Sequence, residues 1–505
     1  MNAQSLVSAA GQPGIWGLFE SRVNDAPDAI ALDHDGERIT YAELAGRVLR
    51  LAGCLTAAGL RHGDRLAWLS RNSNDCIIVE LAAARCGLIC AALNWRLGDR
   101  ELAHCISLVS PKMLLFHPTL RESLAAPQTQ AATASLPVMT VADLLRYDCD
   151  LSQAQEGRGE DGFVILYTSG TTGLPKGALI SHRAMVARAA AFVTDLGLEP
   201  GAHFVAWAPF YHMASTDHAL ATLLRGGTVF VVDGYLPDRL IEIISRYRIG
   251  WFVVMPGMIA DFAQKCADAH LRAAGITCIG AMADLVPRDD LAAITKALNA
   301  PYLNSFGATE TGLPPATRNV VEIGTVPERL PKRQSAFIEI RLVNADDEDV
   351  SPGEPGELAL RGPTLFSGYW NADETNAHDF RNGWFHMGDV MRRNPDGTLE
   401  YIDRVKYMIK SGGENIYPAE IEQVLLRHSD VEEAVVVRRT DAEWGEVPVA
   451  FIVGAANEDA LREICSCDLS SYKHPREFVF TAEEDLPRST TGKIQRHLLE
   501  ARLSG

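Results

Sequence analysis

The sequence lacks several features that mark common classes of binding protein. Its ten cysteines include no C-x-x-C pair, so zinc-ligand spacing is absent and scattered buried thiols in a reducing compartment are expected. The formal net charge of −18 disfavours a general binder of nucleic acid or of anionic membranes. Residues 1–20 lack a basic segment followed by an apolar one, so no signal peptide is predicted. We therefore expect a cytoplasmic protein.

Long apolar runs are also missing. The most apolar stretch, residues 77–93, is interrupted by Glu80 and Arg85. It predicts a buried helix that leads into a strand, and no membrane-spanning segment is expected. The hydrophobic fraction of 47% and the charged fraction of 22% are those of a globular protein.

The chain of 505 residues is long enough for two or more domains. Helix-like and strand-like segments alternate over the first four hundred residues, as in residues 228–232, 237–246 and 251–254. This alternation predicts an α/β fold, with helix-covered β-sheets in a large N-terminal domain of residues 1–404.

The last hundred residues have a different pattern. One helical segment and three short strands predict a small α+β domain, residues 405–505. The predicted segments are a helix at 418–427 and strands at 434–437, 447–453 and 478–480.

The most informative segment is Y-T-S-G-T-T-G-L-P-K-G, residues 167–177. It follows an apolar strand and precedes a helical stretch from His182, which predicts a strand–loop–helix unit. Glycines allow close backbone approach to a ligand, while hydroxyls and N–H groups can surround phosphate oxygens. The Walker pattern fails, because Pro175 replaces its second glycine and Gly177 replaces its Ser/Thr. A P-loop kinase or GTPase is therefore disfavoured.

This string resembles the signature of the adenylate-forming superfamily, which includes acyl- and aryl-CoA ligases, firefly-type luciferases and peptide-synthetase adenylation domains. The chain is most similar in pattern to chlorobenzoate–CoA and fatty-acid–CoA ligases. The resemblance implies that the loop binds the phosphates of ATP. The implied contacts are Thr168, Ser169, Gly170, Thr171, Thr172, Gly173 and Lys176.

Two further motifs resemble the family's nucleotide segments. N-S-F-G-A-T-E, residues 304–310, implies that Phe306 and Gly307 contact adenine and that Thr309 contacts the α-phosphate. Glu310 would bind Mg²⁺, a hard cation that takes oxygen ligands. G-W-F-H-M-G-D, residues 383–389, implies that Asp389 binds the ribose and that Arg404 reaches the same ribose or the phosphate.

The C-terminal motifs imply a mobile domain with a catalytic lysine. P-R-S-T-T-G-K, residues 487–493, ends in Lys493, whose charge would meet the developing charge on the carboxylate and α-phosphate. Lys406 corresponds to the family's hinge. Gly412 and Gly413 would let the phosphopantetheine arm of coenzyme A pass close to the backbone.

The acyl pocket and the coenzyme A nucleotide site follow from the same resemblance. His212, in P-F-Y-H, would lie beside the reacting carboxylate. Where relatives often carry Gly-Gly-Ala-Pro, this chain has I-G-A-M-A-D, residues 279–284, in which Gly280 and Ala281 remain and would contact the adenine of ATP. The implied acyl pocket comprises His212, Met213, Met255, Ala281, Gly307 and Gly312. The implied coenzyme A contacts are Arg96, Gly412, Gly413, Trp444, Tyr472 and Arg476.

These motifs together predict an ATP-dependent carboxylate–CoA ligase. The carboxylate would attack Mg·ATP to give an acyl-adenylate, and the small domain would then rotate so that coenzyme A accepts the acyl group. The expected partners are an apolar fatty or aromatic acid, ATP and coenzyme A, with a homodimer allowed. The alternatives are an adenylate-forming ligase with another acceptor, such as a fatty-acyl-AMP ligase or a carrier-loading enzyme, and a non-catalytic protein with a retained site.

Two other classes of the superfamily fit this sequence less well. A peptide-synthetase domain needs an acid for the substrate ammonium, and the segment after Tyr211 offers none at the family's usual place. A luciferase gains no specific support.

Overall fold

The computed structural model describes residues 10–146, 154–168, 174–488 and 494–503. It divides into two compact units. One comprises residues 1–339 and 361–384, and the other comprises residues 340–360 and 385–505. Within the described residues, no helix combines the length and apolar character that a membrane crossing requires.

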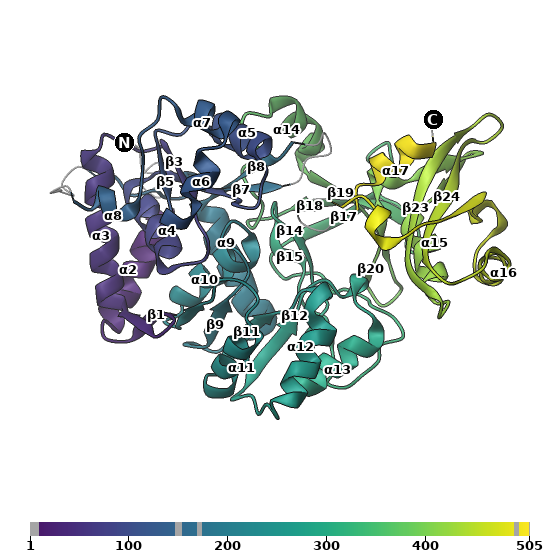
Figure 1. Ribbon diagram of the computed structural model, residues 1–505, viewed down its shortest axis with the longest axis horizontal. Coiled ribbons are helices and arrows are strands. Elements are labelled where there is room, and N and C mark those ends of the chain that lie inside the picture. The colour runs from purple at the N-terminus through teal and green to yellow at the C-terminus, as the bar shows by residue number, and fades with distance from the viewer. Residues whose placement is uncertain (1–9, 147–153, 169–173, 489–493, 504–505) are drawn as a thin grey trace. The chain divides into compact units, whose positions relative to one another are not determined.

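The first unit contains an eight-stranded sheet, ordered β16-β13-β12-β11-β9-β10-β1-β2. All neighbouring pairs are parallel except the two outermost ones. Helices cover it, with α11, α12 and α13 beside β11 and β12 (Figure 1). The strands are β1 (Ile30–His34), β2 (Glu37–Thr40), β9 (His203–Ala206), β10 (Val229–Val231), β11 (Ile249–Val253), β12 (Ile276–Gly280), β13 (Tyr302–Leu303) and β16 (Val320–Val321).

A second sheet of six strands has the order β6-β5-β3-β4-β7-β8. It is parallel except for the final pair, β7 and β8. A separate two-stranded hairpin consists of β14 (Phe306–Ala308) and β15 (Gly312–Ala316). The six strands are β3 (Arg65–Leu69), β4 (Ile89–Leu93), β5 (Met113–Phe116), β6 (Val138–Met139), β7 (Gly162–Thr168) and β8 (Lys176–Ser181).

The core of this unit lies between the two sheets. Helix α4 (Asn74–Cys86) packs against β3, β4 and β7 of one sheet and β1 of the other, and α10 (Met213–Leu223) is buried on every face. The other helices are α2 (Ile15–Asp25), α3 (Tyr41–Ala57), α5 (Asp99–Val109), α6 (Arg121–Leu124), α7 (Pro127–Thr133), α8 (Val141–Leu144), α9 (His182–Leu196), α11 (Pro237–Arg246), α12 (Ile259–Asp268), α13 (Arg288–Leu298) and α14 (Asp373–Asp379).

Local signals explain where several of these helices begin and end. Helix α3 starts after Thr40, whose hydroxyl accepts from the Glu43 N–H while the Glu43 carboxylate accepts from the Thr40 N–H. Pro237 is suited to the first turn of α11 because its missing N–H would have had no helical partner there. Gly87, at φ 63°, ends α4 in the left-handed conformation that glycine adopts without strain.

The second unit combines two sheets. Strands β17 (Glu339–Val343), β18 (Pro355–Arg361), β19 (Phe385–Arg393) and β20 (Leu399–Arg404) form one of them. The other has the order β22-β21-β24-β23, with β25 on β24. Its elements are β21 (Ile409–Ser411), β22 (Glu414–Ile416), α15 (Pro418–Leu425), β23 (Val431–Asp441), β24 (Gly445–Gly454), α16 (Glu458–Asp468), β25 (Glu477–Phe480) and α17 (Arg496–Leu503).

Alternation along β23 gives this second sheet two apolar faces. Ala434 and Val436 belong to a core with side chains of α15 and α16. Val435 and Val437 belong to a core with Leu499 of α17. Successive side chains of a strand point to opposite faces, so both faces are covered by helices.

Two local expectations need correction. Lys176–Ser181 forms strand β8, antiparallel to β7, and helix α9 begins at His182 as predicted. The strand–loop–helix prediction was right about the first strand and the helix and wrong in omitting β8, which forms by pairing with β7. Eight described cysteines are free thiols and seven of these are buried, as expected, but Cys54 is disulfide-bonded.

Candidate active site

The candidate acyl-pocket residues follow the carboxyl ends of neighbouring parallel strands. His212 and Met213 follow β9, Met255 follows β11, and Ala281 follows β12. The chain moves from β9 to β10 on one side and then to β11 on the other, so the strand order reverses between β9 and β11. Ligands of open α/β sheets bind in the crevice at such a point. The topology therefore brings these segments to one edge of the sheet.

His212 forms the N-cap of helix α10. Its ring Nδ1 accepts a hydrogen bond from the Ala214 N–H at 3.1 Å. An accepting Nδ1 carries no proton, so a neutral ring holds its proton on Nε2. The side chain is exposed whereas Met213 is buried, which distinguishes His212 from an ordinary core histidine.

The Thr309–Glu310 segment forms the turn between β14 and β15. Gly307 permits the close approach of these strands, because a Cβ there would lie 2.2 Å from the Gly312 carbonyl oxygen. The Thr311 hydroxyl accepts from the Ala308 N–H at 3.0 Å and closes the turn. Phe306, the predicted adenine contact, is buried at the start of the hairpin.

Arg188 of α9 binds the backbone of the turn between β14 and β15. The side chain is 2% exposed, and its NH2 donates to the Thr309 carbonyl at 2.9 Å. It also donates to the Thr364 carbonyl and pairs with the buried Asp217 of α10 at 3.3 Å. Burial lowers the pKa of Arg188 and raises that of Asp217, and each charge opposes the shift of the other. The ion pair thus joins α9 and α10 to the predicted phosphate and metal segment.

Glu310 and Lys176 both contact the side chain of Tyr369. The Tyr369 hydroxyl donates to Glu310 Oε1 at 2.6 Å, and Lys176 Nζ lies 4.9 Å from the centre of the Tyr369 ring. Tyr369 reaches this position because it bridges Ala178 along the free edge of β8. The predicted metal ligand and the predicted phosphate lysine therefore share a neighbour.

The phosphate loop is described only at its two ends. Thr168 and Lys176 are cross-strand partners, so their side chains leave the hairpin on the same face. Ser169, Gly170, Thr171, Thr172 and Gly173 lie outside the described residues.

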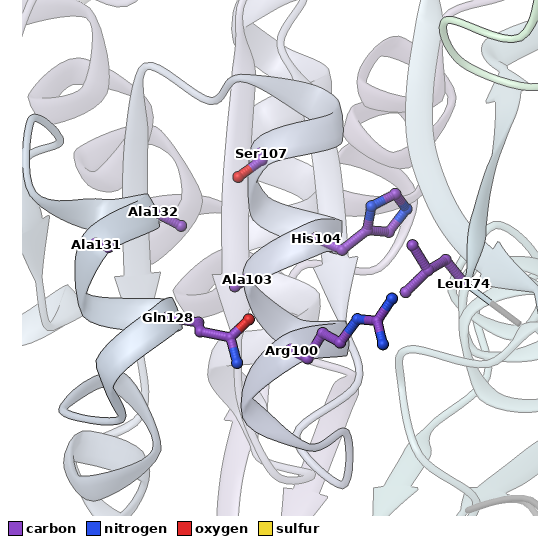
Figure 2. Close-up of a pocket in the computed structure, with 8 residues that line it drawn as sticks. All are labelled: Arg100, Ala103, His104, Ser107, Gln128, Ala131, Ala132 and Leu174. Atoms are coloured by element: carbon purple, nitrogen blue, oxygen red, sulfur yellow. The ribbon is translucent and has the colours of Figure 1, made fainter.

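A cavity of about 420 Å³ lies next to Leu174. None of the residues that line it belongs to the predicted nucleotide, acyl or coenzyme A sites. It lies between α5, α7 and Leu174, and His104 and Arg100 point toward Leu174 (Figure 2). His104 Nε2 lies 3.0 Å from the Pro175 carbonyl oxygen, next to the start of β8.

The unusual segment after β12 is held by a buried ion pair. Lys332 is fully buried and contacts both the Asp284 carboxylate and Asn304 Oδ1. Asn304 Oδ1 also accepts from the Ala283 N–H at 3.3 Å. Burial lowers the pKa of Lys332, and the Asp284 carboxylate opposes that shift.

Gly280 ends β12 at φ 128°, where a Cβ would lie 2.8 Å from the Leu303 carbonyl oxygen. The Ala281 N–H donates to the Tyr302 hydroxyl at 3.2 Å. Together with the lysine pair, these contacts fix the segment from Gly280 to Asp284.

In the second unit, the predicted ribose residues are neighbours. Asp389 of β19 and Arg404 of β20 are cross-strand partners, and Arg404 Nε lies 3.0 Å from Asp389 Oδ1. Asp389 is buried while Arg404 is partly exposed. The pair gives a carboxylate and a guanidinium at the end of one strand ladder.

The hinge residue Lys406 follows this pair directly. It is exposed, its Nζ lies 4.7 Å from the centre of the Tyr407 ring, and its carbonyl accepts from Arg438 NH2 at 3.2 Å. Lys493 lies outside the described residues. Arg488 and Ile494, which are described, form an antiparallel β-bridge.

Three of the predicted coenzyme A residues gather around one indole. The Gly412 N–H donates to the Trp444 carbonyl at 2.9 Å, and a Cβ on Gly412 would lie 2.6 Å from Trp444 Cε3. The Arg476 guanidinium lies 5.6 Å from the Trp444 ring centre. Gly413 has a φ of 90° with open space at its Cβ position.

The remaining two predicted contacts are Tyr472 and Arg96. Tyr472 is exposed beside Lys473. Arg96 belongs to the first unit, where its guanidinium lies 5.0 Å from the centre of the Trp95 ring.

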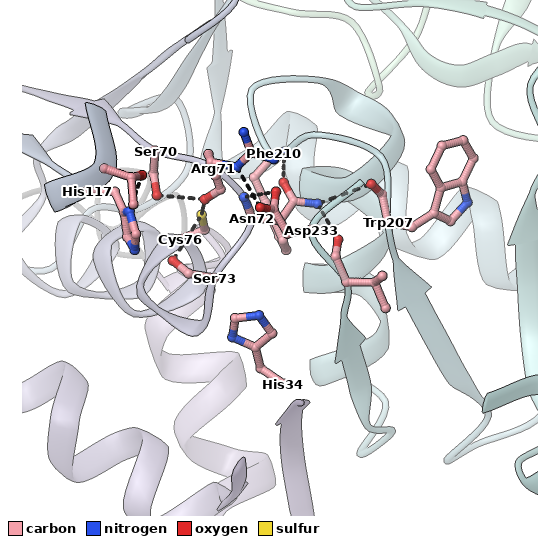
Figure 3. A network of polar contacts seen from close by, with 12 residues as sticks. His34, Ser70, Arg71, Asn72, Ser73, Cys76, His117, Trp207, Phe210 and Asp233 are labelled. Atoms are coloured by element: carbon pink, nitrogen blue, oxygen red, sulfur yellow. Dashed lines mark hydrogen bonds and ion pairs between the residues drawn. The ribbon is translucent and has the colours of Figure 1, made fainter. Parts of the chain in front are cut away.

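Sequence reasoning missed four side chains that hold these segments in place: Asn72, Arg188, Lys332 and Tyr369. Arg188 is the one that a pattern could have revealed, as a charged residue within the apolar stretch of α9. Asn72 forms a network with the turn after β9 (Figure 3).

This fold and site define an adenylate-forming enzyme of two units. Residues 19–370 match the AMP-binding enzyme family, and residues 420–493 match the AMP-binding enzyme C-terminal domain. The chain belongs to the AMP-binding enzyme family, in the class of ATP-dependent acid–thiol ligases, as the sequence predicted.

Relatives match almost the whole length of the chain. A feruloyl-CoA synthase of Amycolatopsis sp. is 34% identical over 95% of this chain and 97% of its own. An indoleacetate–CoA ligase of Aromatoleum aromaticum is 30% identical over 93% and 94%. The o-succinylbenzoate CoA synthetase of Bacillus subtilis, solved with its acyl-adenylate intermediate, superposes with a TM-score of 0.84 at 26% identity, over 97% of this chain and 98% of that one.

Proposed function

We propose that this ligase activates an uncharged aromatic carboxylic acid and transfers its acyl group to coenzyme A in the cytoplasm. The observation that carries the substrate proposal is the pairing of Asp284 with the buried Lys332. Asp217, four residues after Met213, is likewise held by Arg188. Neither acid is therefore available for a substrate ammonium.

The aromatic preference draws support from the relatives. Two of them act, by name, on feruloyl and indoleacetate groups, which are aromatic acids. Met213 and Met255 would offer adaptable apolar contacts to such a ring.

For adenylation, the residues of the first unit would position ATP and neutralise its charge. Thr168 and Lys176, on one face of their hairpin, would contact phosphate oxygens, and Thr309 would contact the α-phosphate. The Tyr369 hydrogen bond orients the Glu310 carboxylate, an oxygen ligand of the kind that Mg²⁺ takes together with substrate phosphates. When bound, Mg²⁺ supplies positive charge to the polyphosphate.

The second unit would contribute to both half-reactions. Asp389 would accept hydrogen bonds from the ribose, with Arg404 orienting its carboxylate. Lys493 would stabilise the charge that develops during adenylation. Rotation about Lys406 would then bring Gly412 to the acyl-adenylate, so that the coenzyme A thiol displaces AMP.

The decisive experiment is a carboxylate panel assayed by exchange of labelled pyrophosphate into ATP and by CoA-dependent AMP release. The panel contains benzoate, cinnamate, indoleacetate, octanoate, succinate and phenylalanine. We expect the highest kcat/KM for an uncharged aromatic acid. Preference for succinate or phenylalanine would reject the substrate proposal, and no exchange with any acid would reject the activity.

Two variants test the two-step scheme. Lys493→Ala should slow adenylation about a hundredfold or more while largely sparing thioester formation from supplied acyl-adenylate. Lys406→Pro should show the reverse, because proline restricts the hinge backbone. Equal loss of both steps in both variants would contradict domain rotation.

A further inference from the structure

Asn72 connects the two sheets of the first unit at the candidate acyl pocket. It follows β3 of the six-stranded sheet and is 6% exposed, yet its side chain contacts the eight-stranded sheet. Its Oδ1 accepts from the Phe210 N–H at 3.1 Å. Its Nδ2 lies 3.2, 3.3, 2.8 and 3.0 Å from the carbonyl oxygens of Ala206, Trp207, Ala208 and Val232. Figure 3 shows Asn72 between Phe210 and Trp207.

The same turn is held from helix α10. The Ser215 hydroxyl donates to the Ala208 carbonyl at 2.5 Å, and the Thr216 hydroxyl donates to the Phe210 carbonyl at 2.5 Å. Both backbone groups of Phe210 are therefore bound by side chains. Buried backbone groups need such partners, and a turn outside regular structure must take them from side chains.

We infer that Asn72 is a positioning residue for the acid-binding wall formed by Phe210, Tyr211 and His212. The assignment of this wall rests on the proposed function, whereas the contacts of Asn72 do not. Only an amide fits the network, because carbonyl oxygens surround one end of the side chain and an N–H faces the other. Movement of the wall by about 1 Å would misplace the reacting carboxylate, which can cost about a hundredfold in rate.

Two substitutions of Asn72 distinguish a hydrogen-bonding role of its side chain from a role in filling space. Asn72→Asp keeps the size of the side chain but places a carboxylate against the carbonyls. Asn72→Ser is smaller but keeps one donor. A space-filling role predicts that the aspartate variant is the milder one, whereas the network predicts that it is the more severe.

The first test measures KM for cinnamate and for ATP in both variants by pyrophosphate exchange. We expect Asn72→Asp to raise KM for the acid about tenfold or more, Asn72→Ser to raise it less, and KM for ATP to change less than about twofold. The matched control is Tyr41→Phe, which removes a buried hydroxyl that lies 3.0 and 2.8 Å from the carbonyl oxygens of Leu223 and Gly227, at and after the C-terminal end of α10. This control should lower stability and leave both KM values unchanged.

The second test needs no substrate. Hydrogen–deuterium exchange of the ligand-free enzyme should speed up in the peptide covering residues 207–214 in Asn72→Asp and not in Tyr41→Phe. If Asn72→Asp does not fold, Asn72→Ser decides both tests.

The results distinguish failure of the positioning role of Asn72 from failure of the proposed function. Unchanged exchange in this peptide, or a KM for ATP that rises with that for the acid, would overturn the inference. Faster exchange in an enzyme whose wild type activates no acid would retain the positioning role and reject the proposed function instead.

Discussion

The Tyr369 hydroxyl donates a hydrogen bond of 2.6 Å to the Glu310 carboxylate, although 59 residues separate them in the chain. The same ring lies against Lys176. One tyrosine thereby contacts both a predicted metal ligand and a predicted phosphate contact. Its position depends on the edge of β8, where Trp370 N–H donates to the Gly177 carbonyl at 2.8 Å.

Tyr369→Phe tests this relationship. The ring remains under Lys176, but Glu310 loses its donor, so we expect adenylation to slow about tenfold and the magnesium dependence to shift to higher concentration. Pyrophosphate exchange over a magnesium titration measures both effects. The control is Tyr407→Phe, whose ring belongs to the second unit. An unchanged magnesium profile in Tyr369→Phe would contradict the assigned role of this contact.

Asp284 and Lys332 should behave as a buried pair. Asp284→Ala strands a fully buried ammonium and should cost about 3–5 kcal/mol of unfolding free energy. The double variant Asp284→Ala with Lys332→Met removes both charges and should recover most of that loss. Denaturant unfolding of the single and double variants measures the coupling. Additive losses would show that the pair has no energetic role.

Glu80 of α4 should make the free energy of unfolding fall as the pH rises. Burial raises its pKa to about 8 from an ordinary value of 4.5, with the Asp217 carboxylate adding to the rise and the Thr216 hydrogen bond opposing it. Between these two values the folded state keeps a proton that the unfolded state releases, so stability falls as pH rises toward 8. The total loss is on the order of a few kcal/mol.

Glu80→Gln removes this titration while keeping a neutral side chain. Urea unfolding at pH 5.5 and pH 8.5 should therefore show a variant that gains on the wild type as the pH rises. Parallel pH profiles for the two proteins would refute the assignment of the slope to Glu80.

Gly412 and Gly413 form a matched pair for the thioester step. Both have positive φ, but only at Gly412 would a Cβ meet the Trp444 ring, at 2.6 Å. We expect Gly412→Ala to slow coenzyme A-dependent AMP release about tenfold or more and to leave pyrophosphate exchange intact. Gly413→Ala should have the smaller effect on AMP release, since its Cβ position is open. Equal effects of both variants would remove the Trp444 contact from the explanation.

Much of the local structure could be predicted from the sequence. The helix at Pro237–Arg246 has the predicted bounds, because a proline at its start and its apolar spacing are local signals. Strand β8 escaped prediction because its identity comes from pairing with β7, and the roles assigned to individual site residues stay predictions.

The sequence alone determined the class of this enzyme, since its phosphate, adenine, ribose and lysine motifs can be recognised in order without knowledge of the tertiary structure. Tertiary structure decided which side chains hold those motifs in place: Asn72 at the turn of Phe210, Arg188 beneath Thr309, and Lys332 beside Asp284. The physical reason is that motifs are local patterns of residues. Hydrogen bonds between distant segments exist only after the order of the strands has brought those segments together.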